Sequence, residues 1–237
     1  MSQNDGSASE VANDGYSDWK NWDTFFQFTA NDASYFEQEL LGVDLRGKRV
    51  LEIGFGEGRF LAWAQAKGAL VEGIELDARA IAAAETAGIA LASQSITDQA
   101  KIAPGAYGLI AAFDVFEHMT VDQIKDHLAA IALLLKTGGL LALRYPNGQS
   151  PFGLAPQHGD VTHITPLSRV KIEQMATRHG FYTVRYAGAA EPRGSGIGRI
   201  GRMFRKLIRR IFGGVLNFVF GQTIIWDSVV THVLRRD

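Results

Sequence analysis

Cysteine is absent from the 237-residue sequence, and this absence excludes several classes of chemistry. A chain without thiols has no disulfide, no thiolate zinc site, no cysteine-bound iron–sulfur cluster and no cysteine nucleophile. Long apolar runs are also lacking, because the most apolar stretch, 211–220, is about half of the roughly 20 residues that a membrane-spanning helix needs. The first residues are polar and acidic, unlike a signal peptide. We therefore expect a cytoplasmic protein, with a peripheral place on the inner face of the plasma membrane as a further option.

The charge balance is nearly neutral overall but uneven along the chain. The formal net charge is −1, and the apolar fraction of 46% is that of an ordinary globular protein. Almost every charged residue in 1–39 is acidic, whereas the charged residues in 193–210 are all basic. Such an asymmetry indicates a charged partner, for example a membrane surface or a nucleic acid.

Three regions follow from composition. Residues 1–15 are rich in Ser, Asn, Asp and Gly and predict a disordered acidic tail. Residues 16–47 gather aromatic side chains and predict a lead-in with a helix over 31–41. This lead-in packs onto a larger body or, as the lesser alternative, covers a site. Residues 48–237 predict the main domain, with a basic amphipathic insert at 196–221.

Short apolar segments alternate with helical patterns through the main domain. This alternation predicts a doubly wound α/β fold, a mostly parallel sheet with helices on both faces. The long loop at 147–166 is of the length that usually carries function. The expected strands are 49–53, 70–75, 89–93, 107–113, 140–145, 181–186 and 224–234, and the expected helices are 59–67, 77–87, 121–135 and 167–179.

A glycine-rich turn follows the first expected strand. Residues 54–58 read Gly-Phe-Gly-Glu-Gly, and glycines there let the chain turn sharply and a ligand approach the backbone. The dinucleotide pattern Gly-x-Gly-x-x-Gly fails, because its third glycine is replaced by Arg59 or Leu61. The carboxylate of Glu52 just before the turn suits a cationic ligand, and Glu75 after the second strand is placed to bind ribose hydroxyls.

Four segments together resemble the class I S-adenosylmethionine-dependent methyltransferases: 50–60, 71–77, 113–119 and 134–146. The resemblance implies a Rossmann-like seven-stranded sheet with an antiparallel last strand, and S-adenosylmethionine as cofactor. It also implies that Glu52 and the glycine turn hold the methionine end, that Glu75 binds the ribose, and that residues after the fourth strand face the transferred methyl group. It places Leu76 against the adenine, whereas the acid that the family often places near 94–96 for the adenine amino group is missing or displaced to Asp98. The cofactor contacts implied are Glu52, Gly54, Phe55, Gly56, Gly58, Glu75, Leu76, Ser95, Ile96, Phe113 and Asp114.

Histidines cluster on two segments expected to overlie the cofactor. His118 follows the fourth strand, and His158, Asp160 and His163 lie in the long loop. An imidazole titrates near pH 6.5 and suits general-base work on a hydroxyl acceptor, so these four are the catalytic candidates. A metal site formed by His158, Asp160 and His163 is the lesser alternative. Its spacing matches no established motif, so the sequence predicts no metal.

The insert has an apolar stripe at helical spacing with basic residues around it. Contact with an anionic membrane through 199–220 explains both the charge and the stripe. Packing against the chain itself or another copy is the second interpretation. A nucleic-acid contact is disfavoured, because no aromatic side chains suited to stacking are interleaved with the basic residues.

The acceptor is predicted less directly than the donor. The segment after the fourth strand lacks the Asn/Asp-Pro-Pro-Tyr/Phe pattern of amino-nucleobase methylation, and no Lys-Asp-Lys-Glu set for RNA ribose is present. The preferred hypothesis is O-methylation of a sugar hydroxyl, on a glycan or a lipid-linked glycan precursor. The alternative is O-methylation of a prenylated quinone, a phenol or another small molecule. A non-catalytic, membrane-docked module is the hypothesis from another class.

Overall fold

The computed structural model describes residues 22–40, 42–190 and 197–237, so the predicted tail at 1–15 and the start of the lead-in lie outside the described residues. Within the described part, seven strands form one sheet in the order β3-β2-β1-β4-β5-β7-β6. β7 is antiparallel to both of its neighbours, and the other pairs are parallel. The predicted fold class is confirmed. The strands are β1 (Arg49–Ile53), β2 (Leu70–Ile74), β3 (Ala90–Leu91), β4 (Tyr107–Phe113), β5 (Leu135–Pro146), β6 (Phe181–Gly188) and β7 (Val229–Arg236).

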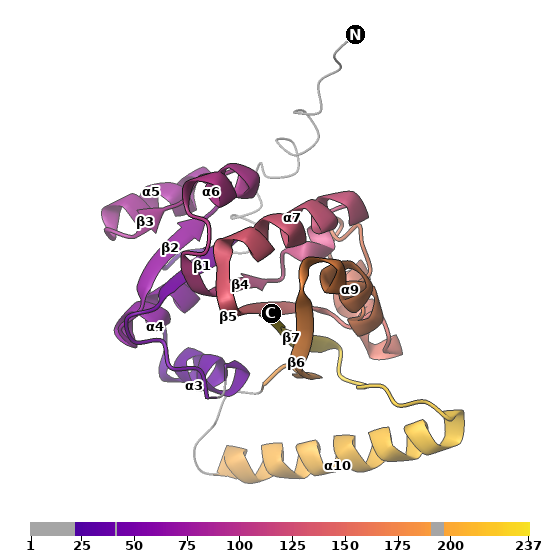
Figure 1. Ribbon diagram of the computed structural model, residues 1–237. Coiled ribbons are helices and arrows are strands. Elements are labelled where there is room, and N and C mark those ends of the chain that lie inside the picture. The colour runs from indigo at the N-terminus through magenta and orange to yellow at the C-terminus, as the bar shows by residue number, and fades with distance from the viewer. Residues whose placement is uncertain (1–21, 41, 191–196) are drawn as a thin grey trace.

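Helices cover both faces of this sheet (Figure 1). One buried cluster joins the sheet to α3, α4 and α5, and a second joins its other face to α6, α7 and α9. The helices are α3 (Ala30–Glu39), α4 (Arg59–Ala66), α5 (Ala78–Thr86), α6 (Ile96–Ile102), α7 (Val121–Leu134), α8 (Leu154–His158), α9 (Arg169–Ala176) and α10 (Ile197–Phe220), with 3-10 turns η1 (Phe116–His118), η2 (Pro151–Gly153) and η3 (Thr177–His179).

Strand β4 shows why both faces are covered. Leu109 and Ala111 point into the cluster under α3, α4 and α5, whereas Ile110 and Ala112 point into the opposite cluster. All four side chains are buried. A strand that is buried on both faces reads as a continuous apolar run, which is the pattern of this segment.

The direction in which the strands are added reverses between β1 and β4. The chain steps outward from β1 through β2 to β3 on one side, and from β4 to β5 on the other. Open α/β sheets bind ligands beyond the carboxyl ends of their strands at such a reversal. The segments that follow β1, β2, β4 and β5 therefore meet along one edge, where the site lies.

Several predicted boundaries differ from the structure. Helix α3 begins at Ala30 because Thr29, in a reciprocal capping box with Asp32, is its N-cap, and it ends at Glu39. Helix α7 ends at Leu134, one residue before the predicted end, and strand β5 begins at Leu135 rather than at 140, because Leu135 already pairs with Tyr107 in the sheet. The last strand covers Val229–Arg236, later than predicted, because its pairing with β5 begins at Val229.

The predicted long loop at 147–166 contains structure of its own. It includes η2 and α8, and its ends are joined by a bridge between Asn147 and Leu167. The buried side chain of Asn147 donates to the carbonyls of Ile225 and Asp227, at 2.7 and 3.0 Å. These bonds hold the start of the loop against the segment before β7.

Helix α10 lies apart from the two helical layers (Figure 1). Its C-terminal half is anchored by Asn217, whose side-chain oxygen accepts hydrogen bonds from Trp226 Nε1 at 2.9 Å and from the backbone N–H of Ile224 at 3.3 Å. Within the described residues, no helix has the length and apolar character needed to cross a membrane.

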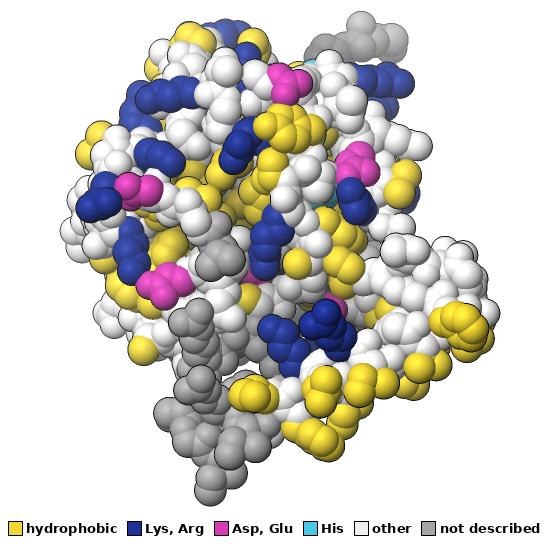
Figure 2. All heavy atoms as spheres, turned by 60° about the horizontal axis from the view of Figure 1, so that its bottom comes forward, with side chains coloured by type: hydrophobic (Ala, Val, Ile, Leu, Met, Phe, Trp, Pro, Cys, Tyr) yellow, Lys and Arg dark blue, Asp and Glu magenta, His cyan; other side chains and the backbone are white. Residues whose placement is uncertain are grey.

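The apolar side of α10 is turned to solvent. Figure 2 shows its hydrophobic side chains in a row along the outer edge of the molecule, with Lys and Arg side chains between that row and the body of the protein. These apolar side chains are between 50% and 88% exposed, which is inconsistent with packing in the chain's own core. The exposed apolar residues are Met203, Phe204, Leu207, Ile208, Ile211, Phe212, Val215, Phe218, Val219 and Phe220.

Candidate active site

The glycine turn lies between β1 and α4, at the strand reversal. Gly54, Gly56 and Gly58 have φ values of +67°, +50° and +69°, which side chains other than glycine rarely adopt. A Cβ on Gly54 would lie 2.7 Å from Cγ2 of Val115, a residue that follows β4. The glycines therefore serve both the turn and the close approach of the β4 loop. Phe55 is buried and packs inward over Gly73 of β2, so only its backbone faces the site.

Two carboxylates flank the turn. Glu75 follows β2, and its Oε2 accepts a hydrogen bond from the Gly56 N–H at 2.7 Å. Glu52 is buried in β1, and its Oε2 has no hydrogen-bond partner among the described residues. Burial and then the Glu75 carboxylate raise the pKa of Glu52 well above its ordinary value. A buried carboxylate with one oxygen unpartnered suits a positively charged ligand, such as an amino-acid ammonium or a sulfonium, so these residues fit the expected cofactor.

The aromatic lead-in packs directly on this turn. The Phe26 N–H donates to the Glu57 carbonyl at 2.7 Å, and its ring lies so close to Gly58 that a Cβ there would be 2.2 Å away. The ring of Trp22 lies over Gly56 in the same way, at 3.0 Å from a Cβ built there. Phe26 itself has a φ of +52°. The lead-in is thus part of the site's wall as well as of the core.

The residues expected near the adenine are spread more widely. Leu76 is 59% exposed beside the end of β2. Ser95 is the N-cap of α6 and accepts from the Asp98 N–H at 3.2 Å, while Ile96 is buried in the core. Asp98 forms a surface pair with Lys101 at 2.7 Å, so it is not turned toward the glycine turn.

The end of β4 is joined to β5 by an ion pair. Asp114, with a φ of +56°, accepts two hydrogen bonds from Arg144, one of them from Nε at 2.8 Å. Arg144 also donates to the Tyr35 hydroxyl at 2.9 Å, and burial raises the pKa of Tyr35 to about 12. Phe113 packs its ring against Phe36 and Phe60 and is therefore part of the core.

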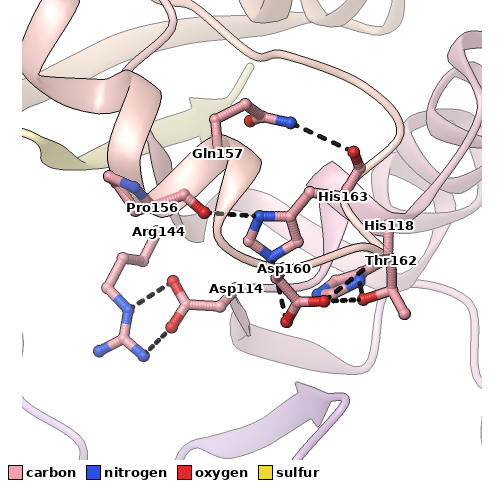
Figure 3. Close-up of polar contacts among 8 residues, drawn as sticks. All are labelled: Asp114, His118, Arg144, Pro156, Gln157, Asp160, Thr162 and His163. Carbon is pink, nitrogen blue, oxygen red and sulfur yellow. Dashed lines mark hydrogen bonds and ion pairs between the residues drawn. The ribbon is translucent and has the colours of Figure 1, made fainter.

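Three of the four predicted catalytic residues form one polar cluster (Figure 3). Thr162 Oγ1 lies 2.9 Å from Nδ1 of His118 and 2.5 Å from Oδ1 of Asp160. The rings of His118 and His163 are edge to face, with centroids 4.6 Å apart. His163 Nδ1 is 3.0 Å from the Pro156 carbonyl oxygen. The fourth candidate, His158, is exposed at the end of α8 and does not take part in these contacts.

Glu117 completes the cluster from η1. Its side chain is fully buried, and its backbone carbonyl accepts from the N–H groups of Ile164 and Thr165, at 2.9 and 3.0 Å. Burial, and then the nearby Asp114 carboxylate, raise the pKa of Glu117 to about 8. The two hydrogen bonds tie the loop after α8 to the turn after β4, so the histidines of both segments face each other.

Sequence reasoning did not single out Arg144, Tyr35 or Thr162. The usable signal was Arg144, which is the charged residue at the carboxyl end of an otherwise apolar strand, 140–145. A charge in such a strand requires a partner. The contact of Tyr35 with Arg144 joins segments 109 positions apart and could not be found from spacing.

Comparison with known proteins extends this geometry. Residues 28–186 match the family model described as a methyltransferase domain. Ubiquinone biosynthesis O-methyltransferases from Burkholderia orbicola and Burkholderia multivorans are 36% and 35% identical over 101 residues. That match covers 40% of this chain and 43% of each relative, so the chain matches less than half the length of these relatives.

Solved structures share the fold over nearly the whole chain. A SAM-dependent methyltransferase from Archaeoglobus fulgidus superposes with a TM-score of 0.65 at 16% identity, over 88% of this chain and 95% of that one. A 1,6-didemethyltoxoflavin-N1-methyltransferase from Burkholderia thailandensis, solved with S-adenosylhomocysteine, has a TM-score of 0.58 at 14% identity, over 100% of this chain and 91% of that one. Identities this low establish the fold alone.

Proposed function

Because the chain belongs to the S-adenosylmethionine-dependent methyltransferases, with S-adenosylmethionine as methyl donor, we propose that it methylates a hydroxyl oxygen of an acceptor held at an anionic membrane surface. The observation that carries the proposal is the combination of a part-buried polar cluster at the edge of β4 with an apolar face on α10 whose side chains are 50% to 88% exposed. The cluster supports the type of reaction, and the helix supports the location of the acceptor.

Different residues of the chain would contact different parts of the methyl donor. When bound, S-adenosylmethionine supplies a methyl group on a sulfonium, which an oxygen nucleophile displaces in line. Glu52 would face the cationic end, since its buried carboxylate oxygen needs a positive partner. Glu75 would take the ribose, and Trp22 and Phe26 would keep water from the glycine turn against which they pack.

The polar cluster gives the site its chemistry toward the acceptor. Methylation forms a bond between the acceptor oxygen and the methyl carbon while the carbon–sulfur bond breaks, and the hydroxyl proton must leave. His118, Asp160 and His163 supply the proton-accepting atoms at this edge of the sheet. A hydroxyl acceptor uses such a cluster, whereas a carboxylate acceptor, which has no proton to lose, does not.

Helix α10 supports a membrane as the place of the acceptor. Its exposed apolar face would enter the interfacial region, and the basic residues of the same helix would meet anionic headgroups. Arg205, Lys206 and Arg210 are all exposed. Nothing in the described part of the chain covers this face, so an anionic bilayer is the occupant that matches both its charge and its apolar area.

An apolar cavity lies between this helix and the loop that leads to the cluster. Its volume is about 520 Å³, and its walls include Phe212 and Leu216 of α10, Phe152 of η2 and Trp226. Phe152 comes just before α8, whose Pro156 carbonyl holds His163. The cavity would accept the hydrocarbon chain of an acceptor drawn from the bilayer while its polar head reaches the cluster.

Two acceptor classes remain. The similarity to relatives named as O-methyltransferases of ubiquinone biosynthesis favours a prenylated phenol or quinol as the acceptor of this chain. A sugar hydroxyl on a lipid-linked glycan is the second candidate, favoured by the polar lining of the cluster, which offers acceptors for several hydroxyl groups.

The acceptor class is tested by incubating the full chain with methyl-labelled S-adenosylmethionine and, separately, a prenylated phenol, a polyprenyl-linked sugar, a soluble phenol and RNA. We expect label in the prenylated phenol. Label in the sugar fraction would replace the first candidate by the second. Intact cofactor binding with no labelled fraction would instead favour the non-catalytic module.

Membrane contact is tested by sedimentation with vesicles. The protein is expected to pellet with phosphatidylcholine vesicles that contain phosphatidylglycerol, and much less with pure phosphatidylcholine. Phe218→Glu places a charge at an 88% exposed position of α10 and should release the protein from the vesicles. The matched control is Ile102→Glu on α6, 70% exposed, which should pellet like the unchanged protein. Equal pelleting by both variants would contradict the role of α10.

A further inference from the structure

Glu117, His118 and His163 place three potential metal ligands around one point. Each offers one ligand atom, and the three atoms all lie within 4.8 Å of one another. Glu117 and His118 come from η1, and His163 comes from the loop after α8, so the point lies between two segments 45 positions apart. The hydrogen bonds from Ile164 and Thr165 to the Glu117 carbonyl hold these segments together without using the Glu117 side chain.

The hydrogen bonds of the cluster fix the tautomer of His118. The Thr162 hydroxyl has one proton, and at 2.5 Å from a carboxylate it gives that proton to Asp160 Oδ1. Thr162 Oγ1 must therefore accept from His118, whose Nδ1 lies 2.9 Å away and must carry a proton. In the neutral ring the lone pair is then on Nε2.

The same argument fixes His163. Its Nδ1 lies 3.0 Å from the Pro156 carbonyl, which can only accept, so Nδ1 carries a proton, and in the neutral ring the lone pair is on Nε2, which lies 3.8 Å from Asp160 Oδ2. An imidazole that donates one ring N–H to a carbonyl or a carboxylate-bound group and keeps the other nitrogen for a cation is the usual arrangement around protein-bound metals. Both rings here donate from Nδ1, and their centroids are 4.6 Å apart.

The Glu117 carboxylate supplies an independent sign of a missing cation. The side chain is 0% exposed, and neither of its oxygens has a hydrogen-bond partner among the described residues. A buried carboxylate without a donor is costly unless a cation or a proton compensates for it. It lies in the same space as the two imidazole lone pairs.

We propose that Glu117, His118 and His163 bind a divalent transition-metal ion of the zinc type, with Thr162 and Asp160 as positioning residues. Two imidazole nitrogens and one carboxylate match zinc and its neighbours, whereas magnesium and calcium prefer a shell made of oxygen alone. Ligands of a tetrahedral zinc ion lie roughly 3.4 Å apart, so the side chains would close by about 1 Å on binding. Three protein ligands leave a coordination position open, as in catalytic zinc sites.

This inference rests on the proposed function only for what the open position does. There it would receive the oxygen of the acceptor hydroxyl and lower its pKa, and with the ion bound this replaces direct proton acceptance by His118 or His163. The binding of the ion itself needs neither cofactor nor acceptor. Its success or failure is therefore separate from that of the proposed methylation.

The test is a titration of chelator-treated full-length protein with ZnCl₂ and, for its spectrum, CoCl₂. We expect one ion per chain, a rise in melting temperature on zinc binding, and cobalt absorption bands typical of mixed nitrogen and oxygen ligands. Glu117→Gln keeps the shape of the side chain, removes a buried charge and should lower zinc affinity about 100-fold or more. Thr162→Val, which removes the hydroxyl that bonds both His118 Nδ1 and Asp160 Oδ1, should lower it by about 10- to 100-fold.

The matched control is His158→Asn, which changes an exposed histidine on the same loop. It should bind zinc as tightly as the unchanged protein. The proposal is overturned if the unchanged protein binds no stoichiometric ion, if Glu117→Gln binds as tightly as the unchanged protein, or if His158→Asn loses binding as Glu117→Gln does. Circular dichroism of each variant shows that the fold is retained, and Glu117→Gln is expected to be at least as stable as the unchanged apoprotein.

Discussion

Arg144 and Asp114 form a two-pronged ion pair across the carboxyl ends of β5 and β4. The guanidinium also donates to the Tyr35 hydroxyl of α3 at 2.9 Å. Asp114 has a φ of +56° and begins the turn that carries Glu117 and His118. The pair therefore holds a strained residue in place and joins the cofactor side of the site to the polar cluster.

Replacing Arg144 by lysine should break these hydrogen bonds while keeping the positive charge. A lysine ammonium cannot bond both Asp114 oxygens and Tyr35 in the geometry of the planar guanidinium. We expect the variant to lose about 1–2 kcal/mol of the free energy of unfolding, measured by urea denaturation. The control is Arg46→Lys, in a surface pair with Asp44 where the side chains are 82% and 63% exposed, and it should change stability by less than about 0.5 kcal/mol. Equal losses in the two variants would contradict the role assigned to Arg144.

The glycine turn is tested by Gly54→Ala. Gly54 and Gly88 both have a φ of +67°, but a Cβ on Gly54 would lie 2.7 Å from Val115, whereas no atom lies within 4 Å of a Cβ on Gly88. Both alanine variants should lose about 1–2 kcal/mol from backbone strain. Only Gly54→Ala should also weaken S-adenosylmethionine binding, measured by calorimetry, because Val115 and the β4 turn must move. If Gly88→Ala weakens binding equally, the site is placed wrongly.

Glu52→Gln tests the charge at the cationic end of the cofactor. One oxygen of the buried carboxylate, Oε2, has no hydrogen-bond partner among the described residues, and the substitution replaces the carboxylate by a neutral group of the same shape. We expect about a tenfold weaker affinity for S-adenosylmethionine, equivalent to about 1.4 kcal/mol. Stability should not fall, since a buried charge has been removed. Calorimetry and thermal melting measure the two quantities, and unchanged affinity would argue that Glu52 does not face the cofactor.

The buried His232 of β7 should make stability depend on pH. Its Nδ1 lies 2.9 Å from the Tyr145 hydroxyl, and its Nε2 lies 2.7 Å from the Thr183 hydroxyl, which donates to Glu173. The ring therefore donates from Nε2, accepts at Nδ1 and is neutral. Burial lowers the pKa of His232 from 6.5 to about 4.

The sign follows from the proton count. Between pH 6.5 and about 4 the unfolded chain binds a proton at His232 that the folded protein does not, so stability is present above pH 6.5 and is lost as the pH falls to 4. We expect a loss of about 3 kcal/mol over that window from this residue. His232→Gln should flatten the same part of the curve in urea denaturation at a series of pH values. A variant as pH-dependent as the unchanged protein would rule out His232 as the cause.

The fold could be predicted from local sequence patterns, because the folded protein keeps the strands and turns that these patterns favour. Strands such as 107–113 are apolar runs of the right length, and the glycine turn after 49–53 is a local feature. The missed boundaries depend on distant partners. Strand β5 begins at Leu135, five residues before the predicted start at 140, because Leu135 pairs with Tyr107, and no local pattern marks that start.

The candidate site was predictable to the level of segments but not of contacts. His118, Asp160 and His163 were expected on loops over the same edge, and the structure brings them together. Which histidine belongs to the cluster depends on the one-turn helix α8, which turns His158 outward and uses the Pro156 carbonyl to hold His163. The metal alternative considered from the sequence combined residues by their spacing, whereas the arrangement here uses Glu117, whose burial only the fold reveals.

The central claim is that this methyltransferase takes a hydroxyl acceptor from a membrane through α10. The most direct measurement is the transfer of labelled methyl from S-adenosylmethionine to a prenylated phenol in anionic vesicles, by the unchanged protein and by Phe218→Glu. We predict that the variant loses most of the labelling in vesicles but keeps it when the same phenol is dispersed in detergent. Equal labelling by both proteins in vesicles, or no labelling of any hydroxyl acceptor by the unchanged protein, would contradict the account.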